Sequence, residues 1–255
     1  MESYFDRVVF MTQLTPKVLA VIASNEPSDA TRRSLESQTV PPAQIVVADR
    51  TFSDRYVGIR VAKAINSALD SLDLARFDWF LNVDGDVVLP PDWIERSAAS
   101  GADVVGRGGY ALLVRMSAFV AVGSRFPVVE AEDSLLMMKL QSLGFKAVPY
   151  VVKPKFTREL GRGVDQSLFM FFRKGISKWK LGYEPAHAVY TSLISAKRMR
   201  NLRYLLGVFG YFFAAAARAE HWDSNVAEFV FHKQIMSLRL DRIRSEADYV
   251  LFQGQ

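Results

Sequence analysis

Short runs of β-branched and other apolar residues alternate with longer amphipathic stretches over the first 150 residues. Val18–Ala23, Ile45–Ala48 and Phe77–Val83 have the length and composition of buried strands. Between the last two, apolar residues from Asp54 to Leu72 recur at three- and four-residue spacing, which predicts a long helix. Strands that alternate with helices are typical of a parallel sheet covered by helices, so we predict an α/β fold.

A second set of elements is expected further along the chain. Short strands are predicted at 103–105, 110–114 and 147–152, with a helix from Asp133 to Leu143 that Gly144 closes. Beyond residue 160 the pattern becomes helical, over 166–174, 186–219 and 224–244. We therefore expect a domain at 1–185 and a helical C-terminal extension at 186–249. The sequence Val-Leu-Phe-Gln-Gly at 250–254 is typical of an engineered protease site, so 250–255 is interpreted as a tag remnant.

Polar residues follow each of the first three predicted strands. Ser24 and Asn25 come after the first strand, Asp49 after the second, and Asp84 and Asp86 after the third. In an open parallel sheet, the carboxyl ends of the strands form the edge at which ligands bind. The pattern therefore predicts a binding site at this edge, built largely from carboxylates.

The Asp84-Gly85-Asp86 triplet is a candidate cation site. Two carboxylates one residue apart point to the same side of an extended chain, and the intervening glycine allows a close turn. Oxygen ligands of this kind suit Mg²⁺ or Mn²⁺. An ordinary turn rich in Asp and Gly is the alternative that the triplet alone leaves open.

A second acidic cluster, Glu130 to Asp133, lies where a helix is predicted to begin. Carboxylates at a helix N-terminus are stabilised by the helix dipole, so capping alone would explain them. An ionised carboxylate within reach of an attacking hydroxyl would instead serve as a general base. Both interpretations stay open on the residues alone.

These segments together resemble the large family of inverting glycosyltransferases with the GT-A fold, called family 2. The matching segments run in order over residues 17–185. They are Ser24-Asn25-Glu26, Ser34 to Gln38, Ile45 to Asp49, Ala64-Ile65-Asn66, Asn82 to Asp86, Gly123 with Phe126, Glu132-Asp133 and Gly144-Phe145-Lys146. The resemblance implies a Rossmann-like, mostly parallel sheet flanked by helices, and a glycosyltransferase that uses a nucleotide-sugar donor.

The resemblance also implies which residues bind the donor. Asp49 would bind its base or ribose, and the segment Ala23, Ser24, Asn25 and Glu26 would line the same pocket. Asp84 would bind the ribose or diphosphate side.

Two further roles concern the cofactor and the reaction. Asp86 would hold Mn²⁺ or Mg²⁺ against the diphosphate, where the metal neutralises charge on the departing group. Asp133, supported by Glu132, would be the catalytic base that takes the proton of the acceptor hydroxyl. A single displacement would then invert the anomeric centre.

Departures from the family pattern refine these expectations. Only one acid follows the second strand, where Asp49 precedes Arg50, and no histidine stands near Val152–Lys155 to complete the metal site. The Arg-Trp pair of processive synthases does not follow Gln166, so a single addition is expected.

The acceptor is the main alternative left open. Arg158 and Arg162 lie in a segment similar to the Arg-x-x-Gly of polyprenyl-phosphate sugar transferases, and their guanidinium groups could clamp a phosphate. A solvated basic loop explains them equally well. The expected partners are therefore a nucleotide-sugar donor and either a glycan or a lipid-linked acceptor.

Composition and charge narrow the kinds of chemistry and the kinds of partner that this chain can have. The 255 residues include no cysteine and only three histidines, which excludes thiolate zinc sites, cysteine nucleophiles and a histidine metal cage. The net charge is −3 over residues 1–150 and +8 over 151–255, which together give +5. A basic half indicates an anionic partner, such as a phosphorylated ligand, a nucleic acid or a membrane surface.

The apolar stretch Tyr204–Ala217 is shorter than the roughly 20 residues of a membrane-spanning helix. Four basic residues between Lys197 and Arg203 precede it, which favours a helix that lies on an anionic membrane. Gly207 and Gly210 equally favour close packing against the rest of the chain or a second copy of it. No secretory signal opens the chain, so we expect a cytoplasmic protein, with the inner face of the membrane and a homo-oligomer as open alternatives.

Two other classes of protein compete with this interpretation. A nucleic-acid-binding protein would explain the basic half, but Phe169, Phe171 and Phe172 fit a core better than a stacking surface, so no nucleic-acid partner is expected. A nucleotidyltransferase would need a glycine-rich, lysine-bearing loop after the first strand, and Ser24–Pro27 has no glycine.

Overall fold

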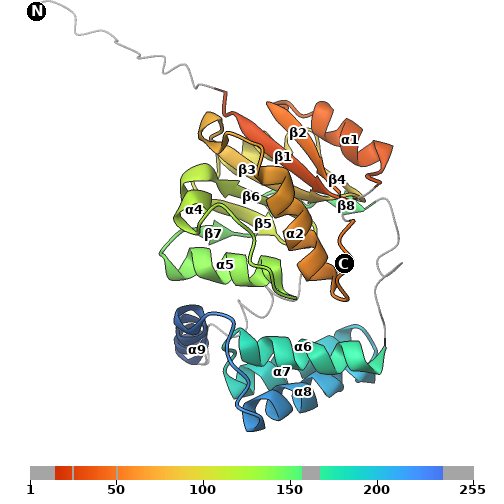
Figure 1. Cartoon of the computed structure of the whole chain (residues 1–255), viewed down its shortest axis with the longest axis vertical. Coiled ribbons are helices and arrows are strands. Elements are labelled where there is room, and N and C mark those ends of the chain that lie inside the picture. The colour runs from red at the N-terminus through yellow and green to blue at the C-terminus, as the bar shows by residue number, and fades with distance from the viewer. Residues whose placement is uncertain (1–14, 25, 50, 157–166, 238–255) are drawn as a thin grey trace, which may run out of the picture.

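A computed structural model describes residues 15–24, 26–49, 51–156 and 167–237. The chain forms a sheet region, in which helices cover both faces of a central sheet, and a helical group built from the residues after 167 (Figure 1). The expected helical C-terminal extension is therefore confirmed.

The central sheet has six strands in the order β2-β1-β3-β6-β5-β7. Their bounds are Gln44–Ala48 (β2), Val18–Ala23 (β1), Trp79–Asp84 (β3), Ala111–Arg115 (β6), Val104–Arg107 (β5) and Ala147–Val148 (β7). β1 pairs in parallel with β2 and β3, β5 pairs in parallel with β7, and β6 lies antiparallel to both of its neighbours. This order confirms the predicted α/β fold with a mostly parallel sheet.

Each face of the sheet carries its own apolar core. On one face, Leu19 and Val21 lie in a cluster with residues of α2 (Val57–Leu69), α4 (Met116–Ala121) and α5 (Glu132–Ser142). On the other face, Ala20 and Ile22 lie in a cluster with residues of α1 (Asp29–Glu36) and α3 (Trp93–Ala98). All of β1 is buried because both faces are covered, which explains its uninterrupted apolar sequence.

The helical group comprises α6 (Leu168–Lys180), α7 (Pro185–Arg198), the 3₁₀ turn η2 (Leu202–Leu205), α8 (Leu206–Ala216) and α9 (Ser224–Ser237). The backbones of α6 and α8 lie very close, because a Cβ atom on Gly175 or Gly210 would overlap the backbone of the facing helix. Lys178 joins α6 to α7, since its Nζ donates to the hydroxyls of Thr191 and Ser192 at 2.8 and 2.9 Å. Burial lowers the pKa of Lys178 to about 8.

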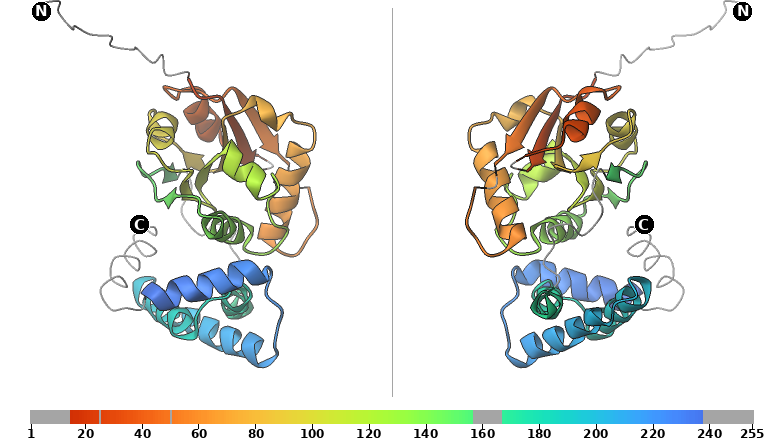
Figure 2. Two further views of the ribbon diagram at one scale, coloured as in Figure 1. Left: turned by 90° about the vertical axis from the view of Figure 1, so that its left-hand side faces the viewer. Right: turned by 90° about the vertical axis from the view of Figure 1, so that its right-hand side faces the viewer.

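An apolar cluster attaches the helical group to the sheet region. Leu135 of α5 lies in this cluster with Leu181, Val226 and Val230. In Figure 2, α9 is the helix of the group nearest the sheet region, and α8 lies on the far side. Residue 185, where the sequence places a boundary, is the first residue of α7 and lies inside this group.

Several predicted elements differ from the structure. The single helix predicted at 186–219 is two helices, because the chain turns at Arg200, whose φ of 46° is incompatible with a helix interior. The strand predicted at 147–152 ends at Val148. Residues 238–244 of the last predicted helix and the expected tag remnant lie outside the described residues. No described helix combines the length and apolar character that crossing a bilayer would require.

Candidate active site

The register of three neighbouring parallel strands brings their carboxyl ends together. Ala23 of β1 is paired with Ala48 of β2 on one side and with Asp84 of β3 on the other. Ser24 and Asp49 follow directly, so both lie at the same edge as Asp84. Two strand spacings, about 10 Å, separate the backbone of Ala48 from that of Asp84. Asp49 is exposed, whereas Ala23 is fully buried.

The turn after Asp84 is fixed by the start of α1. The Gly85 carbonyl accepts hydrogen bonds from the Ser28 N–H at 2.7 Å and from the Thr31 hydroxyl at 3.0 Å. Ser28 also caps α1, because its side chain accepts from the Thr31 N–H. The Cα atom of Gly85 lies so close to Ser24 that any Cβ atom would overlap the serine side chain. Asp84 and Asp86 therefore flank Gly85, whose position is fixed by contacts with Ser24 and with the start of α1.

Some of the residues assigned from the sequence lie outside the described part of the chain. These are Asn25, Arg50, Arg158 and Arg162. The small antiparallel pair of β4 (Val87–Val88) and β8 (Lys155–Phe156) pairs Phe156 with Val87, the residue that follows Asp86. Glu26 is exposed at the same edge of the sheet.

The hairpin of β5 and β6 adds two residues that the sequence did not single out, Arg107 at the end of β5 and Tyr110 in the turn. The Asp84 N–H donates to the Tyr110 carbonyl at 2.9 Å, so this turn adjoins the end of β3. Burial raises the pKa of the Tyr110 phenol, Arg107 opposes that increase, and the Asp84 and Asp86 carboxylates add to it. Both carboxylates and the guanidinium therefore lie within electrostatic reach of one phenol.

Asp133 comes to the same turn from α5. A Cβ atom on Gly108 would overlap the Asp133 side chain, and one on Gly109 would lie 3.7 Å from its Oδ2. Burial raises the pKa of Asp133, while hydrogen bonds at Ser134 and the charge of Arg107 oppose the increase. Arg107 thus interacts with both Asp133 and the phenol beside Asp84, which links the two acidic segments across one turn.

A cavity of about 310 Å³ opens beside Asp133. It is lined by the turn residues Arg107 and Gly108 and by residues of α5, namely Asp133, Ser134, Met137, Met138 and Gln141. The lining combines a carboxylate, a guanidinium, a hydroxyl and an amide with two thioethers. Such a surface can hold a polar molecule against the carboxylate of Asp133.

Glu132 and Asp133 face different segments despite being neighbours. A Cβ atom on Gly58 would overlap the Glu132 carboxylate, so Glu132 lies against the start of α2, whereas Asp133 lies against Gly108. The first peptides of a helix attract negative charge, which favours Glu132 in this position. Neither residue caps α5, whose N-cap is Ala131 without a side-chain hydrogen bond, but both lie in its first turn, and Asp133 Oδ1 accepts the Ser134 N–H at 2.6 Å.

Arg173 of α6 contacts two segments of the sheet region, one of which leads into α5. Its guanidinium forms an ion pair with Glu130 and lies over the ring of Tyr56, with its carbon 3.2 Å from the ring centroid. Tyr56 immediately precedes α2, so one cation joins the helical group to two segments of the sheet region. Burial lowers the pKa of Arg173.

The residues present fit a divalent cation that is shared with a ligand. Within the described ranges, no three His, Asp or Glu side chains form a cluster that would hold a metal alone. Mg²⁺ and similar hard ions are commonly held by one or two carboxylates together with phosphate oxygens of the substrate. Asp84 and Asp86, both near the Tyr110 phenol on a fixed turn, supply such a pair of carboxylates.

Comparisons with known proteins gave matches among solved structures. No family model and no curated protein matches this chain. The mannosyltransferase PcManGT from Pyrobaculum calidifontis, solved with GDP-Man and Mn²⁺, is 15% identical with a TM-score of 0.47, over 91% of this chain and 84% of that chain. The Drosophila β-1,4-galactosyltransferase 7, solved with manganese, UDP-Gal and xylobiose, is 14% identical with a TM-score of 0.45, over 59% and 75% of the two chains. TarS from S. aureus is 15% identical with a TM-score of 0.42, over 84% and 55%.

Proposed function

We propose that this chain is a metal-assisted, inverting glycosyltransferase that moves one sugar from a nucleoside-diphosphate donor to an acceptor hydroxyl. The observation that carries the proposal is that one turn adjoins both acidic segments, since the Tyr110 carbonyl accepts the Asp84 N–H and Gly108 lies against the Asp133 side chain. A cavity beside Asp133 provides room for a second substrate. Sugar transfer needs both an anion-binding side and a base, and this edge of the sheet offers the two functions on adjoining segments.

The nucleoside of the donor binds along the ends of β1 and β2. The exposed Asp49 accepts hydrogen bonds from the base or ribose, and the segment from Ala23 to Glu26 lines the pocket. Asp84, one strand further along, contacts the ribose or the diphosphate. The parallel register supports this assignment, because nucleotides bind at the carboxyl edge of open α/β sheets.

The diphosphate lies at the turn between β3 and β4. Asp86, with Asp84, would hold Mn²⁺ or Mg²⁺, which would neutralise the charge of the nucleoside diphosphate as it leaves. The hydrogen bonds to the Gly85 carbonyl hold the turn in place before the donor arrives. The phenol of Tyr110 can donate a hydrogen bond on the same side, because a phenol is protonated at neutral pH and burial shifts its pKa further upward.

Asp133 is the base of the proposed reaction. The acceptor oxygen forms a bond to the anomeric carbon while the bond from that carbon to the diphosphate breaks, and the bonding electrons leave with the nucleoside diphosphate. The hydroxyl proton passes to the Asp133 carboxylate, whose raised pKa makes it a stronger proton acceptor than an exposed aspartate. Because the acceptor enters from the side opposite the diphosphate, the configuration at the anomeric carbon inverts.

Two measurements on the full chain test this function. Isothermal titration with UDP, GDP and dTDP, each with and without Mn²⁺, should reveal one nucleoside diphosphate that binds more tightly with the metal. Transfer from the matching nucleotide sugar to glycan acceptors should then give, by proton NMR, the anomer opposite to that of the donor. Absence of metal-dependent binding for every nucleotide contradicts the proposal, and a retained anomeric configuration contradicts the assignment of Asp133 as base.

A further inference from the structure

α8 has two faces of opposite character. Its inner face, formed by Gly207, Gly210, Tyr211 and Ala214, is buried against the rest of the helical group. Its outer face carries three phenylalanines whose spacing of three and four residues places them on one side of the helix. Phe209 is 66% exposed, Phe212 48% and Phe213 60%. The small residues that allow close packing therefore occupy one face. The three aromatic rings stay largely exposed, although Phe213 touches the ring of Phe172 and Phe212 that of Tyr211. We call Phe209, Phe212 and Phe213 the aromatic face.

Exposed apolar residues continue onto the neighbouring elements. Leu202 of η2 is 77% exposed, and Met199, just after α7, is 54% exposed. Leu193 of α7 is also exposed. Single exposed apolar residues are common, but contiguous groups of large ones mark surfaces that bind a partner.

The stretch of sequence that contains the aromatic face carries charges of one sign. Lys197, Arg198, Arg200 and Arg203 lie between the last turn of α7 and η2, directly before α8. No Asp or Glu occurs between Glu184 and Glu220 in the sequence, which includes all of α7 and α8. Among the described residues, α7, η2 and α8 thus combine aromatic rings with positive charge and contribute no carboxylate, which makes them complementary to an anionic partner with an apolar interior.

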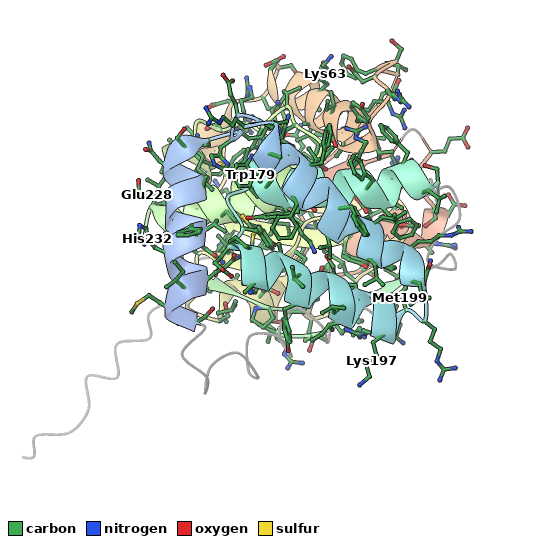
Figure 3. All side chains as sticks on the ribbon, turned by 90° about the horizontal axis from the view of Figure 1, so that it is seen from below. Lys63, Trp179, Lys197, Met199, Glu228 and His232 are labelled. Carbon is green, nitrogen blue, oxygen red and sulfur yellow. The ribbon has the colours of Figure 1, made fainter. Side chains whose placement is uncertain are left out.

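The position of this surface leaves it accessible. Figures 1 and 2 place α8 on the side of the helical group away from the sheet. Seen from that side, α7 and α8 lie across the face of the molecule, and the labelled Lys197 and Met199 project at its lower right (Figure 3). The labelled Glu228 lies on α9, at the opposite side of the same view (Figure 3). A flat partner could thus contact the aromatic face and the basic residues together.

We propose that this surface docks the protein on an anionic lipid bilayer, with α8 lying in the plane of the membrane interface. The 11 residues of α8 span about 16 Å, roughly half the hydrocarbon thickness, so the helix can lie on a bilayer but cannot cross it. The phenylalanines enter the boundary between headgroups and acyl chains, and the basic residues contact anionic headgroups. This inference stands apart from the proposed function, because it uses none of the candidate active-site residues.

Co-sedimentation of the full chain with vesicles tests the docking. Vesicles of phosphatidylcholine with about a third phosphatidylglycerol should bind the protein, pure phosphatidylcholine vesicles should bind it far less, and raising the salt concentration should weaken binding. Replacing Phe209 and Phe213 by serine should weaken binding by about tenfold or more. Lys197→Gln and Arg200→Gln should each weaken it by about fivefold, which corresponds to ~1 kcal/mol per charge.

Matched controls separate docking from general effects. Phe231→Ser removes an exposed ring from α9, and Lys63→Gln removes a cation from α2, and neither should change vesicle binding. Thermal unfolding should show that all variants remain folded, since each substituted side chain is at least partly exposed. Nucleoside-diphosphate binding in solution should be unchanged, so a failure of docking is distinguishable from a failure of the proposed function.

Three outcomes would overturn the docking proposal. The first is equal binding of the wild-type protein to neutral and anionic vesicles. The second is unchanged vesicle binding when the aromatic face is substituted. The third is a wild-type protein that does not bind vesicles but forms a dimer in sedimentation velocity, where the same substitutions dissociate that dimer. That result would assign the surface to a second copy of the chain.

Discussion

Replacing Asp133 by asparagine should lower the rate of sugar transfer and, at neutral pH, raise the free energy of unfolding. Asparagine has the same shape, and its side-chain oxygen can still accept the Ser134 N–H that Asp133 Oδ1 accepts at 2.6 Å. The substitution removes only the ability to carry charge and to take a proton. Loss of the base should reduce sugar transfer by about 10² to 10⁴, the usual contribution of acid–base catalysis, without weakening donor binding.

The same substitution should stabilise the folded protein at neutral pH. Burial raises the pKa of Asp133 in the folded state, so the ionised carboxylate is unfavourable there compared with the unfolded chain. Below the ordinary aspartate pKa of about 3.8 the group is protonated in both states, and the difference between variant and wild type should vanish. As the pH rises through the raised pKa, the wild type loses stability relative to the variant. At pH 7 we expect a gain of about 1–2 kcal/mol, or roughly 2–8 °C in Tm.

Thermal and urea unfolding of both proteins between pH 3.5 and 8 checks this expectation. Glu36→Gln serves as the control, because it neutralises an exposed carboxylate on α1 and should alter stability by less than about 0.5 kcal/mol at every pH. An Asp133→Asn protein that is less stable than wild type at pH 7 would contradict the burial argument. Wild-type transfer rates in that variant would contradict the assignment of the base.

Three other substitutions probe separate parts of the account. Asp86→Asn should abolish the effect of Mn²⁺ on nucleotide affinity in isothermal titration, and an unchanged metal effect would place the cation elsewhere. Gly85→Ala should displace the turn and weaken nucleotide binding, whereas Gly123→Ala, where a Cβ meets nothing within 4 Å, should cost backbone strain but spare that affinity. In urea unfolding, Arg173→Ala should cost about 2 kcal/mol because its ion pair is partly buried, whereas Arg125→Ala, with an exposed pair, should cost less than about 1 kcal/mol. Equal costs would mean that the Arg173 contacts contribute little.

The sequence predicted the elements whose signals are local. β1 and β2 follow from uninterrupted apolar runs, and both are within one residue of the predicted bounds. Ser28 belongs to the residue types that favour helix N-caps, and its side chain caps α1. Because parallel strands share one edge, the pattern also indicated which strand ends would adjoin. Because helices cover both faces of the sheet, its strands are continuous apolar runs. Such a run can be recognised in the sequence without knowing which strand it pairs with.

The features that sequence reasoning missed depend on distant contacts or on turn chemistry. Arg107 and Tyr110 lie in a hairpin turn, and the Gly108-Gly109 pair between two short apolar runs is a signal that could have revealed it. The same signal would have predicted that β6 runs antiparallel to β5. The approach of Asp133 to Gly108 joins segments about 25 residues apart, and nothing local specifies it. The spacing of the glycines in α8 also could not decide whether their face packs against this chain or another partner, because glycine favours close contact with either.

Manganese located in crystals grown with the preferred nucleoside diphosphate tests the central claim most directly. Anomalous scattering should give one peak about 2 Å from a carboxylate oxygen of Asp86, bridging to the diphosphate, with the open side of that group directed toward Asp133. A peak remote from Asp86, or a nucleotide bound away from the carboxyl ends of β1 and β3, would contradict the account.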